Sequence, residues 1–191
     1  MSVSIGQGGV TVTPIQLAAM MSMIANRGHL FEPRIVAAFS GHTARESGLM
    51  PPVERSKLSD YPYWDTIING LQRVVTGPTG TARRLRASEM TIAGKTGTAQ
   101  VISAQALKRL GYTSEAEVDP RFWDHNWFAG FGPVDSPEVV VVVLLENSGK
   151  IGAQKKFEIT KKVFLRWYEL NKPGRFGPEP PAPLNESRHH A

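Results

Sequence analysis

Apolar residues at helical spacing predict a helix near the start of the chain. Thr13, Pro14 and Gln16 form the sequence of a capping box with proline at the first helical position, and Gly28 provides a stop. Apolar residues then recur at Ile15, Ala18, Ala19 and Met23. Residues 40–60 are polar and rich in turn-forming residues, which predicts a long surface loop.

Two further helices are expected, one in the middle of the chain and one near its end. The first of these starts near Asp60 and stops by Gly77-Pro78-Thr79-Gly80, because glycine and proline interrupt helices. Its apolar residues at helical spacing are Trp64, Ile67, Ile68, Leu71 and Val75. The other covers about 154–171. One of its sides is formed by Phe157, Thr160, Phe164, Trp167 and Asn171. The pairs Lys155-Lys156 and Lys161-Lys162 are expected to face solvent.

Three strands are predicted between these two helices, in the segments Met90–Val101, Trp127–Phe131 and Val139–Leu145. The last segment is apolar throughout and does not alternate, which indicates a strand buried on both faces. Helices should therefore cover both sides of the sheet. Ser103–Asp124 is a long polar connection with at least one helical turn around 106–110. Together these elements predict an α+β fold.

Composition sets the extent of the folded part. With 191 residues, of which 41% are hydrophobic, the chain can build one domain, and we assign residues 1–172 to it. Residues 173–191 are rich in proline and have no periodic apolar face, so they are expected to be a disordered tail. No apolar run is long enough to span a membrane, and the N-terminus does not resemble a secretion signal.

Charge and cysteine content exclude several classes of function. The net charge is +5, but the basic residues are scattered and no aromatic residues alternate with them, so no nucleic-acid partner is expected. The absence of cysteine excludes disulfides, thiol catalysis and thiolate metal sites. The five histidines lack carboxylate neighbours at metal-binding spacing. We therefore predict neither a metal nor a cofactor.

The segment most informative about chemistry is Gly94-Lys95-Thr96-Gly97-Thr98. Its first three residues match the end of a phosphate-binding loop, but the position that needs the first glycine of that motif holds Glu89. A carboxylate there would repel phosphate, so this interpretation fails. The alternative is the Lys-Thr-Gly element of penicillin-recognising enzymes, which lies on an edge strand.

Each residue of this element has a physical role in that interpretation. An edge strand lets a peptide or β-lactam pair with its backbone, and Gly97 permits close approach. Lys95 supplies positive charge for a substrate carboxylate and for proton transfer. The hydroxyls of Thr96 and Thr98 can bind that carboxylate, and the Thr98 amide can stabilise an oxyanion. An isolated Lys-Thr-Gly triplet is a weak signal, so its surroundings decide the interpretation.

These surroundings resemble class B penicillin-binding proteins. Gly6-Gln7-Gly8 followed by Thr13-Pro14-Ile15-Gln16 is similar to that family's G-Q-G and T-P-x-Q stretch. Gly80-Thr81-Ala82, the Lys-Thr-Gly segment and His125–Pro133 then follow in the family's order. The resemblance covers about residues 4–170.

The resemblance is strongest to the elongation-specific member, the transpeptidase of the rod-shape machinery, at Asp124-His125 and Leu145-Glu146-Asn147. It implies the penicillin-binding and serine β-lactamase-like transpeptidase fold, in which antiparallel strands are covered by helices. It implies D,D-transpeptidation of peptidoglycan stem peptides ending in D-Ala-D-Ala, with β-lactams as inhibitors. It also implies a rod-shape glycosyltransferase partner, bound through regions absent here, and a place on the periplasmic side of the inner membrane.

Two motifs of the family are missing from the sequence. No lysine has a serine three positions before it, so the S-x-x-K nucleophile motif is absent, and neither S-x-N nor Y-x-N occurs. We therefore expect the C-terminal part of a transpeptidase domain, inactive by itself and lacking two of the family's five sheet strands. The loss of those strands would leave apolar surface exposed.

Two alternatives remain at this stage. The chain could be a fragment of a serine β-lactamase or D,D-carboxypeptidase, although the G-Q-G stretch and the Trp127-Phe128 strand argue against it. It could also be a non-catalytic remnant or assembly piece. His125 is not expected to transfer protons, and Glu146-Asn147 is interpreted as a turn. Trp64, Trp127 and Trp167 are assigned to the core.

Overall fold

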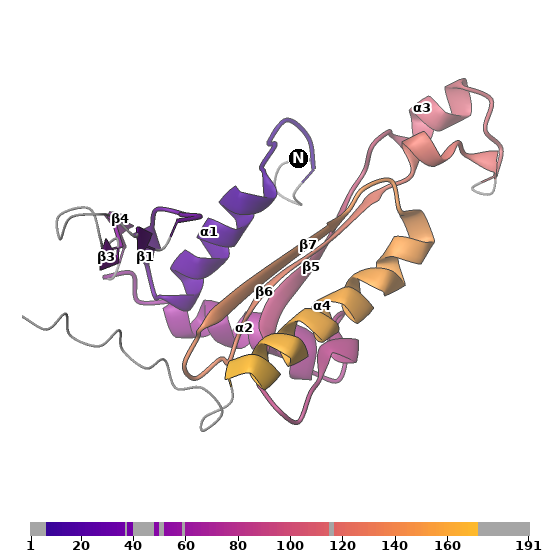
Figure 1. The fold of residues 1–191 in the computed structure, drawn as a ribbon. Helices are drawn as coiled ribbons and strands as arrows, with labels where there is room; N and C mark the ends of the chain where they lie inside the picture. The colour runs from indigo at the N-terminus through magenta and orange to yellow at the C-terminus, as the bar shows by residue number, and fades with distance from the viewer. Residues whose placement is uncertain are drawn as a thin grey trace, which may run out of the picture.

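A three-stranded antiparallel sheet with helices on both faces forms the centre of the molecule in a computed structural model of the chain (Figure 1). The structure describes residues 7–36, 38–39, 48–49, 52–58, 60–114 and 117–171. The predicted tail at residues 173–191 therefore lies outside the described residues. The α+β prediction is confirmed.

The sheet consists of β5 (Ala93–Ala99), β6 (His125–Gly132) and β7 (Val139–Leu145), in the order β5-β6-β7. All three predicted strands are present, and the bounds of β7 are those predicted. β6 starts two residues before the predicted segment, so His125 is its first residue rather than a residue preceding it. In the described part of the chain, the outer edges of β5 and β7 have no partner strand.

Both faces of the sheet are covered, as the continuous apolar run of β7 predicts. On one face α4 (Gly149–Asn171) packs against Val141 and Val143, and on the other α1 (Pro14–Ala25) packs near Val140 and Val142. Side chains alternate between the faces along a strand, so each face of β7 receives every second valine. The side chains of β7 are therefore buried or half-buried on both faces of the strand, and all of them are apolar.

The α1 helix begins with the predicted capping box, in which the side chains of Thr13 and Gln16 bond to each other's backbone N–H groups. The predicted apolar face is wrong, because Ile15 is 58% exposed and Ala18, Ala19 and Met23 are only partly buried. The residues that pack against the sheet are Leu17, Met21, Ile24 and Ala25. Small and apolar residues occur on all sides of α1, so the spacing of apolar residues in the sequence does not identify the face that packs on the sheet.

The segment assigned to a surface loop contains a strand, which is a correction. β4 (Glu54–Lys57) pairs antiparallel with β1 (His29–Phe31), and the two-residue strands β2 (Ala38–Phe39) and β3 (Gly48–Leu49) pair with each other. Every residue of β4 is exposed, so no apolar alternation marks it in the sequence. Residues 40–47, 50–51 and 59 of the predicted loop lie outside the described residues.

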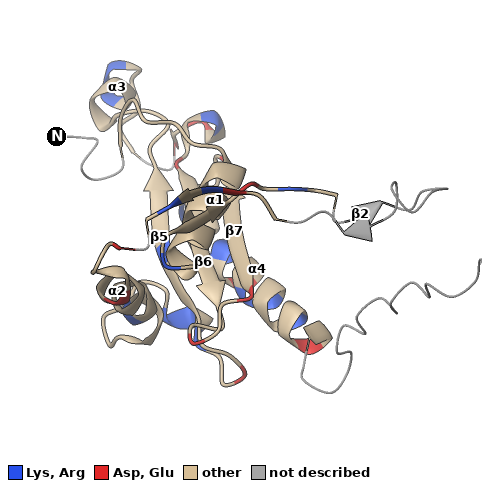
Figure 2. Ribbon diagram, turned by 90° about the vertical axis from the view of Figure 1, so that its left-hand side faces the viewer, with Lys and Arg blue, Asp and Glu red and all other residues tan. Residues whose placement is uncertain are grey.

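The long connection between β5 and β6 contains α3 (Ala104–Arg109) and the 3₁₀ helix η4 (Pro120–Phe122), which confirms the expected helical turn. The Asp119 side chain caps η4 by accepting a hydrogen bond from the backbone N–H of Arg121. Figure 1 places α3 beyond one end of the sheet. Lys and Arg lie on several elements rather than along a single one (Figure 2).

The α2 helix (Trp64–Thr76) starts later than Asp60 and buries Trp64, Ile68 and Val75, three of the five residues predicted to form its apolar side. Its C-terminal carbonyl groups are bound by a side chain from the following segment, which includes the 3₁₀ helix η2 (Arg83–Leu85). Arg86 donates from Nε to the Val75 carbonyl at 2.9 Å and from Nη2 to the Thr76 and Gly77 carbonyls at 2.6 and 2.8 Å. The guanidinium therefore satisfies groups that a helix end leaves unpaired.

Arg86→Ala should lower the free energy of unfolding by about 1–2 kcal/mol, because a charged donor to several carbonyl groups is lost. Urea-induced unfolding of the purified protein measures this change. Arg84→Ala is the matched control, because Arg84 is an exposed residue of the same segment. Equal stability of the two variants would show that the Arg86 contacts contribute nothing.

Candidate functional site

The candidate site is the free edge of β5, where all four predicted residues Lys95, Thr96, Gly97 and Thr98 lie. Lys95 and Thr98 are exposed, and the other two are partly buried. In an antiparallel pair the N–H and C=O groups of one residue point to the same side, and those of the next residue point to the opposite side. The backbone N–H and C=O groups of Thr96 and Thr98 point outward, away from β6, because their carbonyl oxygens accept from the side chains of Lys95 and Gln7.

The Lys95 ammonium lies at this edge, because its Nζ donates to the carbonyl oxygen of Thr96 at 2.8 Å. Lys95 pairs with Ala129 and Thr96 with Phe128, so their side chains leave the strand on opposite faces of the sheet. The lysine side chain therefore folds round the edge to reach the outward carbonyl. This arrangement brings a positive charge to the line of backbone groups that a pairing peptide would meet.

Thr96 has a second threonine beside it. Its Oγ1 is 2.9 Å from Oγ1 of Thr81, in the Gly80-Thr81-Ala82 segment that resembles the family motif. Ala82 is fully buried, which fixes this segment against the core. Two adjacent hydroxyl groups at the edge of β5 can together hold a carboxylate. Thr81 was not predicted as a site residue.

Gln7 connects the G-Q-G stretch directly to β5. Its Nε2 donates to the Thr98 carbonyl at 2.8 Å, and its Oε1 accepts from the backbone N–H of Gln100 at 3.3 Å. The side-chain amide thus pairs with the edge as a neighbouring strand would. These contacts show that the backbone of Thr98 points away from β6. No role for Gln7 was predicted, because a contact across this sequence separation leaves no local pattern.

Close packing fixes β5 on β6. Gly94 lies opposite Gly130, with the ring of Phe128 beside both. A Cβ atom on Gly94 would lie 2.5 Å from that ring, and one on Gly130 would lie 2.8 Å from it. Side chains at either position would push the two strands apart, so these glycines keep the candidate edge in place.

Lys156 lies beneath β5, on α4, and contradicts the expectation that both lysine pairs face solvent. Only 4% of its surface is exposed. Its Nζ lies 3.3 Å from Oδ1 of Asn126 and 3.5 Å from the carbonyl oxygen of Gly97. Burial, and then the positive charge of Lys95, lower the pKa of Lys156. The α4 helix starts at Gly149, five residues before the predicted start near 154.

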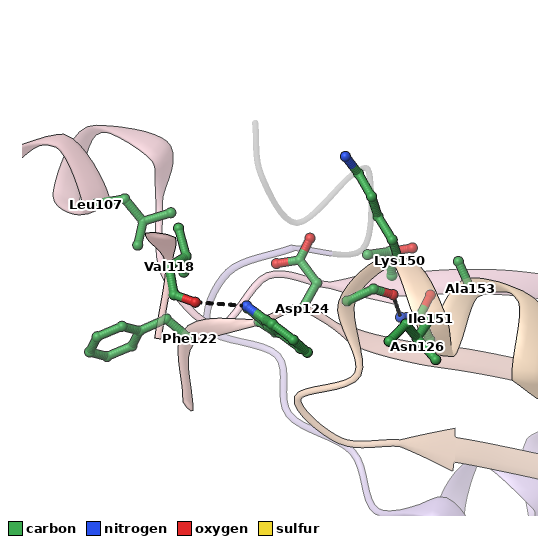
Figure 3. A pocket seen from close by; sticks show the side chains of 11 residues that line it. Leu107, Val118, Phe122, Asp124, Asn126, Lys150, Ile151 and Ala153 are labelled. Carbon is green, nitrogen blue, oxygen red and sulfur yellow. Dashed lines mark hydrogen bonds between the residues drawn. The ribbon is translucent and has the colours of Figure 1, made fainter. Parts of the chain in front are cut away.

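A cavity of about 520 Å³ adjoins the end of β5 at Thr98. It lies between the β5–β6 connection and the first turns of α4, and its lining is mainly apolar (Figure 3). The lining residues are Thr98, Leu107, Val118, Phe122, Trp123, Asp124, Asn126, Gly149, Lys150, Ile151 and Ala153. The indole N–H of Trp123 donates to the Val118 carbonyl at 2.9 Å, which holds one wall of the cavity in shape.

His125 and Asn147 hold the turn that leads from the end of β7 into α4, at the same end of the sheet as the cavity. The backbone N–H of Asn147 donates to Nδ1 of His125 at 2.8 Å, and Asn147 Nδ2 donates to the Arg121 carbonyl at 2.7 Å. Asn147 has φ 44°, a left-handed conformation that suits asparagine. The interpretation of Glu146-Asn147 as a turn is confirmed, and His125 has a structural partner.

Two absences can be stated for the described residues only. They contain no group of three or more His, Cys, Asp or Glu side chains placed to hold a metal ion. None of their helices combines the length and the apolar character needed to cross a bilayer. Of the predicted tryptophans, Trp64 is buried, whereas Trp127 and Trp167 are half-buried.

Comparison with known proteins agrees with the resemblance. The penicillin binding protein transpeptidase domain matches residues 1–167. The peptidoglycan D,D-transpeptidase MrdA of Haemophilus influenzae is 34% identical over 165 residues, which are 85% of this chain and 24% of that protein. MrdA of Acinetobacter baumannii is 35% identical over 166 residues, 87% of this chain and 24% of that protein. The chain thus spans about a quarter of the length of these curated relatives.

Solved structures give the same family. PBP2 of Pseudomonas aeruginosa, in complex with WCK 5153, is 35% identical with a TM-score of 0.63, over 95% of this chain and 35% of that one. PBP2 of Helicobacter pylori, in a complex with MreC, is 26% identical with a TM-score of 0.65, and the match covers 88% of this chain and 27% of that one. The expected similarity to the elongation-specific members is confirmed by relatives named MrdA and PBP2. The chain belongs to the penicillin-binding protein transpeptidase family.

Proposed function

We propose that this chain forms the Lys-Thr-Gly wall of the acylation cleft of a peptidoglycan D,D-transpeptidase, and that the nucleophilic serine lies outside these 191 residues. One observation carries the proposal. The outer edge of β5, which has no partner strand among the described residues, presents the Thr98 N–H, the Lys95 ammonium and the paired hydroxyls of Thr81 and Thr96 within one strand length, while Gln7 holds the Thr98 carbonyl. Such an edge suits a peptide that pairs by its backbone and ends in a carboxylate.

The proposed reaction proceeds in two steps. The serine Oγ attacks the carbonyl carbon of the penultimate D-alanine, its proton passes to a neighbouring base, and the carbonyl oxygen becomes an oxyanion. The oxyanion accepts from the Thr98 N–H, while the terminal carboxylate lies near Lys95, Thr96 and Thr98. The peptide C–N bond breaks and D-alanine leaves as an amine that takes the proton. An amine of a second stem peptide then attacks the acyl carbon and forms a new amide bond, while the ester C–O bond breaks and a proton of the amine passes to the serine oxygen.

A β-lactam follows the first step only. Its strained amide is attacked in the same way, but the leaving nitrogen stays attached to the acyl group, so the ester persists. The cavity beside Thr98 is placed to take the part of a ligand that extends past the end of β5.

By family, the full-length protein acts on the periplasmic side of the inner membrane with a rod-shape glycosyltransferase. The MreC complex of the Helicobacter pylori relative is consistent with an assembly of this kind.

Labelling with a fluorescent penicillin tests the proposal. The full-length protein that contains this chain should give a labelled band that survives denaturation. The 191-residue chain should give none, because none of its serines lies in an S-x-x-K motif. Prior treatment with unlabelled penicillin is the control and should abolish the band.

Three results would count against the proposal. A persistent label on the 191-residue chain would reveal a nucleophile within it. A full-length protein that contains the chain and is never labelled would favour the non-catalytic alternative, in which the domain serves assembly only. A labelled protein that rapidly releases hydrolysed penicillin would instead indicate a β-lactamase.

A further inference from the structure

Lys156 is a buried cation whose hydrogen-bond partners are both neutral. Oδ1 of Asn126 and the carbonyl oxygen of Gly97 accept from it, and the charged residue that shifts its pKa, Lys95, is also positive. Taking an ammonium group out of water is costly unless it is well paired. A methionine or leucine would fill the same space without that cost. The position therefore holds a charge that packing does not require.

The Asn126 amide is oriented to receive this charge. Asn126 is 2% exposed, and its Nδ2 donates to the Ser148 hydroxyl at 3.1 Å and to the Gly149 carbonyl at 2.7 Å. Both of these partners lie at the start of α4, so Oδ1 must point the other way, towards Lys156. A chain of contacts thus runs from the first turn of α4 through Asn126 and Lys156 to Gly97.

The contact with Gly97 bears on the neighbouring amide. The Gly97 carbonyl and the Thr98 N–H belong to one peptide group, which is planar and trans, so they point in opposite directions. The Gly97 carbonyl points inward, towards β6, where Lys156 reaches it from the face of the sheet that α4 covers, and the Thr98 N–H points outward at the outer edge of β5. A cation at the carbonyl end polarises the peptide group and strengthens its N–H as a donor. It adds to the restraint that the antiparallel pairing of Gly97 with Trp127 already places on the peptide plane.

We propose that Lys156 is a positioning residue for acylation, which holds and polarises the Gly97–Thr98 peptide group from beneath the sheet so that the Thr98 N–H stabilises the oxyanion. The inference rests on the proposed function, because it needs the Thr98 amide to act on a tetrahedral intermediate. Lys156 does not touch the substrate in this arrangement. Its contribution belongs to the chemical step rather than to ligand binding.

The test uses the full-length protein and separates the two steps of penicillin acylation by rapid mixing. Lys156→Met keeps the volume and removes the charge. Its acylation rate constant should fall about tenfold, while the dissociation constant of the pre-acylation complex stays within about twofold, because an oxyanion donor acts only in the transition state. Its melting temperature should be unchanged or higher, since the buried charge is gone. Lys155→Met is the control, because Lys155 is exposed on the same helix, and it should match wild type throughout.

Two more variants separate charge from hydrogen bonding. Lys156→Arg retains the charge and should keep the acylation rate constant near the wild-type value. Lys156→Gln retains a donor without the charge and should behave like Lys156→Met. This pair decides the question even if Lys156→Met does not fold. A wild-type rate constant in Lys156→Gln, or equal losses in the Gln and Arg variants, would overturn the inference.

Lys95→Ala in the same assay separates this inference from the proposed function. If acylation collapses in Lys95→Ala but is unchanged in Lys156→Met, only the role of Lys156 is wrong. If Lys95→Ala acylates as wild type does, the assignment of the cleft itself fails.

Discussion

Replacing Lys95 by alanine in the full-length protein should slow acylation by penicillin about a hundredfold and leave the melting temperature unchanged. The ammonium lies at the free edge of β5, next to the outward carbonyl of Thr96, where a ligand carboxylate and the reacting serine would need positive charge. Loss of one such electrostatic contact costs about 3 kcal/mol in the transition state. Lys95 is exposed and fills no space in the core, so stability should not change.

The measurement is the second-order acylation rate constant, with thermal unfolding recorded on the same samples. Thr98→Val is the companion variant and should lose less activity, because only a hydroxyl is removed and the backbone amide remains. A solvated surface lysine would give the opposite result, with neither rate nor stability affected. Near-wild-type acylation of the Lys95→Ala variant would show that β5 does not form the wall of the acylation cleft.

Phe164→Ala should destabilise the protein by about 3–5 kcal/mol, which is the usual cost of removing a large aromatic side chain from a core. Phe164 is fully buried and joins α4 to the sheet and to η2. Its neighbours in this cluster include Leu85, Phe128 and Val143. No small rearrangement of a helix and a sheet can fill the space that the ring occupies.

Urea-induced unfolding gives the change in free energy. Val163→Ala is the control on the preceding residue, because Val163 is 43% exposed and its loss should cost far less. A similar small effect of both substitutions would mean that α4 is not packed on the sheet as the structure shows. Because Phe164 lies far along α4 from Lys156, its effect on acylation should follow from stability alone.

The parts of the fold that follow from local sequence could be predicted. The capping box of α1 and the run Val139–Leu145 depend on residues close together in the chain, and the structure contains both. The strand β4 could not be predicted, because all its residues are exposed to solvent. Its pairing also depends on β1, which lies more than twenty residues away in the sequence. Periodicity reports burial, and it says nothing where burial is absent.

The candidate site was predicted in part for the same reason. Lys95 and Thr98 were identified because they stand in a recognisable short motif. Gln7 and Thr81 reach the same strand from distant segments, and their contacts are visible only in three dimensions. Lys156 was assigned to the solvent because it is one of two adjacent lysines. On a helix, neighbouring residues point about 100° apart, so one of a pair can be buried while the other is exposed.

The sequence of β7, whose outer edge has no partner strand among the described residues, affects how the chain behaves before it is folded. Val139–Leu145 has no charge, no proline and strong β propensity, which is the composition of segments that stack into cross-β fibrils. Pro137, Glu138 and Glu146 flank it and act against such stacking. Folding of one molecule is independent of concentration, whereas association of two is not. The yield of refolded protein should therefore fall as concentration rises, and lowering concentration should recover it.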